Sequence, residues 1–248
     1  MPRRTLPDSI ERQPEEFAAV LATDAPLFLV GGQAVNLWAL YYRERTAGLA
    51  PFVSRDVDVL GDRETLLLIG KVAGVKPQFF TKGPATNEIG VVIATSPDGR
   101  PLPVEVLRYV HGIGNEDLCR PAYTIVLGAS GVTVRVPSPV ALLQAKIANL
   151  ADLSQGGRQD ARHVRILAQL MPAYLADLQA SVAAGRLDER GMLDLLERLL
   201  AVVTPRKARL ALASLVIPRR SLFSELEVAP PSRLSSFFTK RLPKALTE

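Results

Sequence analysis

The hydrophobic pattern of the sequence changes once, near Ser138-Pro139, and this change constrains the fold more than any other feature. Before it, short apolar or alternating runs typical of strands are mixed with helical patterns. After it, as far as about Leu215, apolar residues recur at helical spacing, with breaks at Gly156-Gly157, Gly185 and Pro205. The sequence therefore predicts an α/β part of about 137 residues followed by a helical part.

The same patterns predict where each element begins and ends. In the first part we expect strands at 26–30, 56–60, 88–95, 102–109 and 132–136, and helices at 8–23, 33–45 and 63–72. Asp98-Gly99 is a strong turn signal and predicts a hairpin between two of these strands. In the second part we expect helices at 139–152, 159–179, 188–202 and 206–216. Three segments result: an α/β core at 1–137, a helical domain at 138–218 that completes a cleft, and a basic C-terminal tail at 219–248.

Composition excludes several classes of protein. The chain has 248 residues, of which 48% are hydrophobic and 22% charged, as expected of a globular protein that needs no disulfide or metal to fold. The single cysteine, Cys119, excludes an intrachain disulfide and an all-cysteine zinc site, and His111 and His163 are too few for a multi-histidine metal centre. The apolar runs are too short to span a membrane, and the basic start lacks the apolar stretch of a secretory signal. We expect a cytoplasmic protein that has no membrane partner.

Positive charge is concentrated at the C-terminal end. The net charge is +5, but the residues from Val203 onward contain nine Lys or Arg and three Glu, so the rest of the chain is close to neutral. A basic segment of this kind suits a polyanion, because each phosphate that it neutralises releases counterions. A solvated tail explains the same charge, and basic tails are a signal of low specificity for nucleic acid.

Asp56 and Asp58 form the most chemically specific motif. They are two residues apart on a predicted strand, so both carboxylates face the same side. Two neighbouring anions repel each other unless a cation lies between them, and Mg²⁺ prefers oxygen ligands of this type. On spacing alone, such a pair is more often an exposed polar strand face than a metal site.

Two further features favour the metal site. Gly31-Gly32 ends the preceding predicted strand, where a backbone without side chains can approach phosphate and offer the N–H groups of the next helix. Glu105 is a third carboxylate on an otherwise apolar predicted strand. Together these residues could hold a metal-bound triphosphate. The alternatives are that the glycines form only a strand-to-helix turn and that Glu105 faces water.

These residues resemble the nucleotidyltransferase superfamily, which includes the minimal nucleotidyltransferases, the aminoglycoside nucleotidyltransferases and polymerase β. The resemblance lies in Phe28-Leu-Val-Gly-Gly-Gln-Ala-Val35, in Ser54-Arg-Asp-Val-Asp-Val-Leu60 and in Glu105. It extends to Val136-Pro-Ser-Pro139, Lys146 and Arg158-Gln-Asp160, which are similar to segments of the branch that contains the AbiEii-type toxins. The chain departs from the pattern in having Glu at 105, where Asp is commoner, and His163 in place of a second acid.

The resemblance implies an α/β (α+β) nucleotidyltransferase fold, with a mixed β-sheet flanked by helices and a C-terminal helical region. It also implies a magnesium-dependent transfer of NMP from NTP to an acceptor hydroxyl. Two Mg²⁺ ions would be held by Asp56, Asp58 and Glu105, with Lys146 and Asp160 as further catalytic residues. The nucleotide would contact Gly31, Gly32, Gln33, Arg55 and Lys146.

The resemblance leaves the acceptor and the partners open. The acceptor hydroxyl could belong to tRNA or another RNA, to a protein or to a small molecule, and the toxin-like branch suggests a toxin with a cognate antitoxin. The alternative function is a catalytically silent module of the same fold that binds RNA or protein. Lys146 could also be an exposed helical lysine, Asp160 an intrahelical partner for Arg158 or Arg162, and His163 a surface or hydrogen-bonded helix residue.

Overall fold

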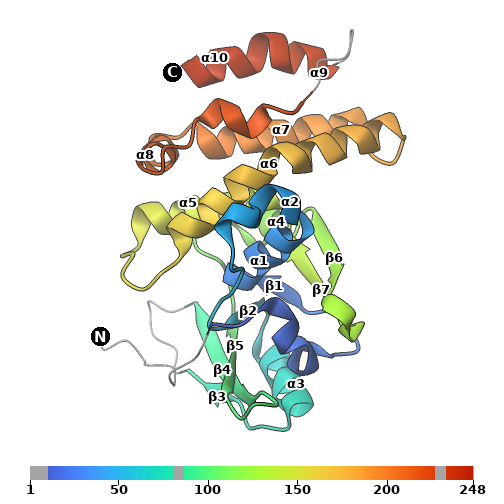
Figure 1. Cartoon of the computed structure of the whole chain (residues 1–248), viewed down its shortest axis with the longest axis vertical. Helices are drawn as coiled ribbons and strands as arrows, with labels where there is room; N and C mark the ends of the chain where they lie inside the picture. The colour runs from blue at the N-terminus through green and yellow to red at the C-terminus, as the bar shows by residue number, and fades with distance from the viewer. Residues whose placement is uncertain (1–10, 81–86, 227–232, 248) are drawn as a thin grey trace. The chain divides into compact units, whose positions relative to one another are not determined.

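The computed structural model describes residues 11–80, 87–226 and 233–247. The chain divides into two compact units (Figure 1). The first comprises Met1–Tyr41 and Ala50–Ser138, and the second comprises Tyr42–Leu49 and Pro139–Glu248. The second unit therefore includes a short excursion from the N-terminal half, which the change of pattern near Ser138 does not reveal.

The first unit is built around a β-sheet. Its strands are β1 (Phe28–Val30), β2 (Val57–Leu60), β3 (Gln78–Phe79), β4 (Glu88–Thr95), β5 (Pro101–Leu107), β6 (Ala122–Val126) and β7 (Thr133–Pro137). Its helices are η1 (Pro14–Leu21), α1 (Gly31–Tyr41), α3 (Arg63–Ala73), α4 (Asn115–Leu118) and η3 (Gly128–Ser130). The five expected strands are all present, whereas β3 and β6 were not expected. The expected first helix is a 3₁₀ helix over Pro14–Leu21 in the described residues.

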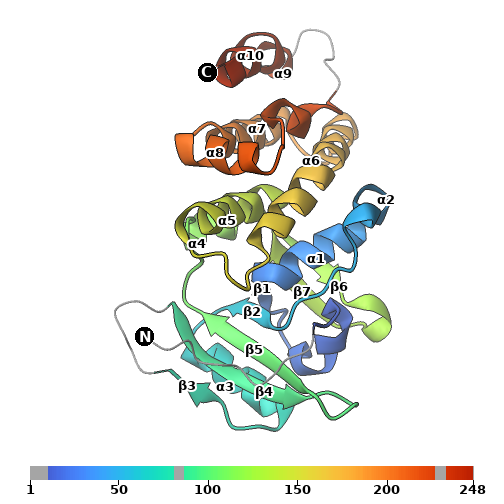
Figure 2. The ribbon, with the colours of Figure 1, turned by 60° about the vertical axis from the view of Figure 1, so that its left-hand side comes forward.

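The strands form one seven-stranded mixed sheet in the order β3-β4-β5-β2-β1-β7-β6 (Figure 2). β2 pairs parallel with β5, and β1 pairs parallel with β7, while the other neighbours are antiparallel. The predicted hairpin is present between β4 and β5. The central strands are buried on the face that carries Val57, Val59, Val104 and Val106, each with no exposed surface. This arrangement confirms the expected mixed sheet flanked by helices.

Local sequence explains where α3 begins and ends. The side chain of Asp62 accepts a hydrogen bond of 2.9 Å from the backbone N–H of Thr65, which caps the first turn. Gly74 ends the helix in the left-handed conformation, with φ of +66°. The helix packs on β4 through Leu66, close to Gly90, where an added Cβ would come within 2.6 Å of Leu66 Cδ2. The sheet thus needs a glycine at this contact.

The second unit is helical. It contains α2 (Arg43–Thr46), η2 (Ala47–Leu49), α5 (Pro139–Asp152), α6 (Asp160–Ala183), α7 (Glu189–Val203), α8 (Arg206–Ser214), η4 (Arg219–Phe223), α9 (Arg233–Ser236), the π-helical segment η5 (Phe237–Arg241) and α10 (Leu242–Thr247). The four expected helices correspond to α5 to α8, with ends that differ by a few residues. The excursion is held to α6 because Tyr42 donates a hydrogen bond to Asp177 (2.8 Å) and Arg162 donates one to the Leu49 carbonyl (2.7 Å).

The described part of the basic C-terminal segment is helical and contributes apolar residues to this unit. Leu222, Phe223 and Phe237 are buried. Arg241 forms an ion pair of 3.3 Å with Glu197 of α7, and the backbone N–H of Leu234 donates to Glu189 Oε1. Among the described helices of both units, none combines the length and apolar character needed to cross a membrane.

Candidate active site

Asp58 and Glu105 lie directly opposite each other on the parallel strands β2 and β5. Their neighbours along the strands, such as Val57 and Val104, are fully buried on the other face, so the alternation of a strand places both carboxylates on one face. Both side chains are only partly exposed. The register therefore brings together two carboxylates that are far apart in the sequence.

Asp56 is the third carboxylate of this group, but it does not lie on the strand as predicted, because β2 begins at Val57. It lies two residues before Asp58 and is also partly exposed, and its Oδ1 accepts a hydrogen bond of 3.1 Å from the hydroxyl of Ser54. The charges of both aspartates raise the pKa of Glu105, which shows that the three acids share one local field.

Burial and like charge act together on Glu105. Burial has the largest effect, followed by the charges of Asp58, Asp56 and Glu88, and together they raise the pKa of Glu105 to about 9. A carboxyl group in this state holds a proton at neutral pH when no cation is near. A bound cation would favour the ionised form, because opposite charge lowers the pKa of a carboxyl group.

Gly31 places the start of α1 against Asp58. Its φ is +67°, and an added Cβ would overlap Asp58 Oδ2 and lie 2.6 Å from Asp58 Cγ. Only glycine combines this backbone conformation with so close an approach. The N-terminal end of a helix carries partial positive charge and free N–H groups, which suits anions beside the carboxylates. Gly32 is buried in the same first turn.

Two of the predicted nucleotide-binding residues differ in their environment. Arg55 is exposed and lies beside Asp56 in the sequence, where it is available to a ligand in solution. Gln33 is completely buried, its Nε2 donates to the Arg12 carbonyl (3.0 Å), and its Oε1 accepts from Asn36 (3.1 Å). The structure thus gives the Gln33 side chain a role in holding α1 to the N-terminal segment.

Lys146 and Asp160 form a separate cluster in the helical unit. Lys146 Nζ lies 3.1 Å from Asp160 Oδ1, and both side chains are buried. Arg158 Nε contacts Asp160 Oδ2 at 2.6 Å, and Asn149 donates to Asp160 Oδ1 at 3.3 Å. Burial by itself would raise the pKa of Asp160, but the charges and hydrogen bonds of Lys146 and Arg158 outweigh it and lower that pKa. The cluster is an ionised, buried network.

His163 packs beside this network and was predicted to be a surface or hydrogen-bonded residue. That prediction is wrong. The side chain is 5% exposed, and within the described part of the chain neither ring nitrogen has a hydrogen-bond partner. Burial, followed by the charge of Lys146, lowers the pKa of His163 well below its usual value. The sequence signal that could have indicated burial is that Ile166 and Leu167, three and four residues later and so on the same side of α6, are apolar and buried.

The donor set suits a hard divalent cation, although the side chains do not form a closed cage. Across residues 11–80, 87–226 and 233–247, no group of three or more His, Cys, Asp or Glu side chains is arranged to hold a metal ion. The acids around Asp58 nevertheless offer only carboxylate oxygens, which Mg²⁺ prefers, and their mutual repulsion favours a cation among them. The chemistry of these residues therefore fits magnesium.

No protein-family model and no curated protein matches the chain. Among solved structures, the chain is similar to an antigenic nucleotidyltransferase-like protein from Paracoccidioides brasiliensis, with 14% sequence identity and a TM-score of 0.41. The similar region covers 84% of this chain and 94% of that one. A likeness of this degree carries no inference about activity.

Proposed function

We propose that this protein is a magnesium-dependent nucleotidyltransferase that transfers NMP from NTP to an acceptor hydroxyl. The observation that carries the proposal is the parallel register that sets Asp58 opposite Glu105, with Asp56 in the same local field. A cluster of partly buried carboxylates is unfavourable without a cation, and a metal–triphosphate complex supplies both the cation and a substrate. The start of α1 at Gly31 lies beside this cluster, where backbone N–H groups can meet phosphate oxygens.

Each residue has a defined part in the proposed reaction. Asp56, Asp58 and Glu105 would hold two Mg²⁺ ions, which when bound offset the negative charge of the triphosphate and of the transition state. The Glu105 carboxylate would accept the proton of the acceptor hydroxyl. The acceptor oxygen forms a bond to the α-phosphorus, the bond from that phosphorus to the bridging oxygen breaks, and pyrophosphate leaves with the electron pair.

Further contacts are proposed for residues outside the carboxylate cluster. Gly31 and Gly32 leave the backbone accessible to phosphate, and Arg55 is an exposed cation next to Asp56. Lys146 is buried in the helical unit and pairs with Asp160 at 3.1 Å, so neither residue is included in the proposed nucleotide contacts. Because the side chain of Gln33 is engaged in the core, the proposed nucleotide contacts do not include it.

For the acceptor we favour RNA, and tRNA is the candidate that we favour within total RNA. Six basic side chains from Arg206 onward are exposed in the described residues, and they include Arg220, Lys240 and Lys244. Basic groups at a surface attract the phosphate backbone and make binding depend on salt. A protein or a small molecule as acceptor remains an outcome of the same assay. We also propose that the protein acts as a toxin and that a cognate antitoxin restrains it.

The second candidate is a catalytically silent module that binds RNA or protein. The observation that favours it is that the described acids are not arranged as a ready metal cage. A silent module would bind RNA without needing the carboxylates, which repel phosphate. A carboxylate substitution should therefore abolish nucleotide transfer by an enzyme but leave RNA binding by a silent module unchanged.

The test is incubation of the purified protein with each α-labelled NTP, Mg²⁺ and total bacterial RNA, followed by detection of label on RNA or on protein. We expect label that is lost in Asp58→Asn and kept in Glu64→Gln, an exposed acid in the first turn of α3. Label that persists in Asp58→Asn contradicts the proposed site. RNA binding that is unaffected by Asp58→Asn, without transfer of label from any NTP, supports the silent module.

A further inference from the structure

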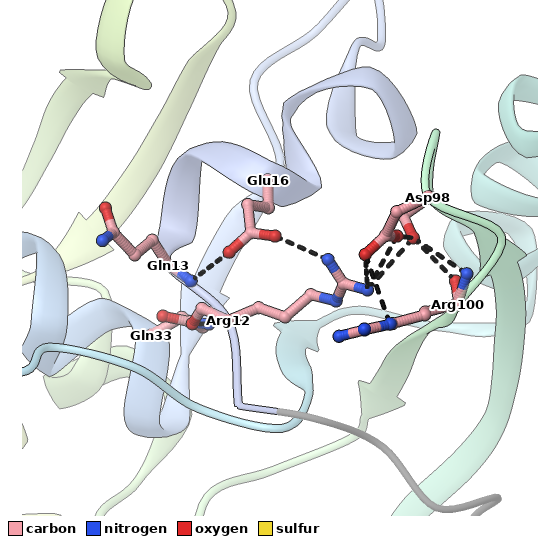
Figure 3. Close-up of polar contacts among 7 residues, drawn as sticks. Arg12, Gln13, Glu16, Gln33, Asp98 and Arg100 are labelled. Atoms are coloured by element: carbon pink, nitrogen blue, oxygen red, sulfur yellow. Dashed lines mark hydrogen bonds and ion pairs between the residues drawn. The ribbon is translucent and has the colours of Figure 1, made fainter.

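Arg12 is a buried cation that joins two elements of the first unit (Figure 3). Its side chain is 6% exposed, and its Nη1 lies 2.6 Å from Glu16 Oε2 in η1. Its Nη2 donates to Ser96 Oγ (3.1 Å) and to Asp98 Oδ1 (3.0 Å) in the turn between β4 and β5. A buried guanidinium is costly unless its donors are paired, and these contacts pair both terminal nitrogens, whereas Nε has no hydrogen-bond partner among the described residues.

The backbone of Arg12 holds the segment that leads into β2. Its N–H donates to the Ser54 carbonyl at 2.8 Å, and the Ser54 N–H donates to the Arg12 carbonyl at 3.0 Å. The same Arg12 carbonyl accepts the hydrogen bond from the buried amide of Gln33 in α1. The two residues thus form an antiparallel bridge outside the named strands, anchored to the helix that begins at Gly31.

Ser54 connects this bridge to the carboxylate cluster. Its hydroxyl donates to Asp56 Oδ1 at 3.1 Å, two residues further along the chain. Asp56 precedes the first residue of β2, Val57, so it lacks the ladder hydrogen bonds that hold Asp58. The Ser54 hydroxyl and the Arg12 bridge are therefore the contacts that define where the Asp56 carboxylate lies.

We propose that Arg12 and Ser54 are positioning residues for Asp56, and that they orient its carboxylate for a divalent cation. The inference rests on the proposed function and adds two residues to it. Partners that orient a metal ligand typically change metal affinity by about 10- to 100-fold when they are removed. A purely structural role would instead lower thermal stability without a separate loss of metal affinity.

The first experiment measures Mn²⁺ binding to the full chain by calorimetry, together with the melting temperature. Ser54→Ala is expected to weaken Mn²⁺ binding about 10-fold with little change in Tm, because it removes one partly exposed hydroxyl. Ser54→Thr keeps the hydroxyl and is expected to restore binding. Ser130→Ala is the control, since the Ser130 hydroxyl also donates a local hydrogen bond, to the Leu127 carbonyl, but lies between β6 and β7.

The second experiment tests the link through Arg12. Arg12→Gln removes the charge that anchors the Arg12 side chain to Asp98, and it is expected to weaken Mn²⁺ binding. Arg100→Gln removes the other cation beside Asp98 and is expected to leave Mn²⁺ binding unchanged. If Arg12 acts through Ser54, the effect of Ser54→Ala is smaller in the Arg12→Gln background. Arg12→Lys retains the charge without the forked geometry, and it serves if Arg12→Gln does not fold.

The outcomes separate the two proposals. If the unsubstituted protein binds no Mn²⁺ and transfers no label, the proposed function fails and the positioning role fails with it. If it binds Mn²⁺ but Ser54→Ala binds equally well, only the positioning role is overturned. A parallel fall in Tm and in affinity that Ser54→Thr does not rescue also overturns it.

Discussion

Gly31 and Asp58 meet at the point where β1 passes into α1 and faces β2. The Asp58 carboxylate occupies the space that a side chain at residue 31 would need, and the φ of +67° at Gly31 is one that glycine adopts readily. A side chain at residue 31 would therefore strain the backbone and also displace the Asp58 carboxylate.

Gly31→Ala is expected to displace Asp58 and to abolish Mn²⁺ binding and nucleotide transfer. It is also expected to lower the free energy of unfolding by about 2–4 kcal/mol, since overlap adds to the strain of positive φ. The matched control is Gly74→Ala, where φ is +66° but no atom lies within 4 Å of the added Cβ. We expect that control to cost only about 1 kcal/mol and to keep Mn²⁺ binding. Equal losses in the two variants, measured by chemical denaturation, would show that the contact with Asp58 is unimportant.

Glu105→Gln is expected to stabilise the metal-free protein, and increasingly so as the pH rises. The pKa of Glu105 is about 9 in the folded state and near 4.5 in the unfolded state, so the folded protein binds more protons between these values. Stability of the unsubstituted protein therefore falls as the pH rises from about 4.5 to 9, and Gln removes that loss. We expect a gain of about 1–3 kcal/mol at pH 9 and almost none at pH 4. A pH-independent difference in denaturant midpoint would contradict this account of Glu105.

Asp160→Asn is expected to destabilise the helical unit by about 3–5 kcal/mol, because Lys146 would be left buried without its counter-charge. The control is Asp152→Asn, which breaks a contact with Lys207, whose side chain is 73% exposed. We expect that change to cost no more than about 1 kcal/mol. Thermal unfolding of both variants distinguishes a buried network from a surface pair, and similar costs would argue against the network.

His163→Phe is expected to protect the protein against acid. The pKa of His163 lies well below 6.5 in the folded state, so the unfolded state binds more protons as the pH falls below about 6.5, and stability is lost in that direction. Phe does not titrate and leaves no ring nitrogen without a partner. The variant should unfold at a lower pH than the unsubstituted protein while the two differ little at pH 8. An unchanged acid-unfolding midpoint would show that another group controls this transition.

Much of the fold could be predicted because helices and strands are encoded by residues that lie near one another. The spacing of apolar residues predicted α5 as it is observed, and Asp98-Gly99 predicted the hairpin between β4 and β5. β3 was not predicted, since two residues contain no readable period. β6 was not predicted because neither of its faces is buried, so its apolar residues do not alternate clearly. Its backbone hydrogen bonds to β7 hold it in the sheet.

The sequence by itself determined that Asp58 lies on a strand two residues after Asp56, that two glycines mark the start of a helix, and that a helical part follows an α/β part. Only the tertiary structure decided that Glu105 lies opposite Asp58, that Gln33 is buried against the Arg12 backbone, and that His163 is enclosed. Periodicity reports which side of an element is buried, but it does not report which element covers it. Strand order and register depend on how the whole sheet buries its apolar face, so β2 and β5 are neighbours in the sheet although α3, β3 and β4 separate them in the chain.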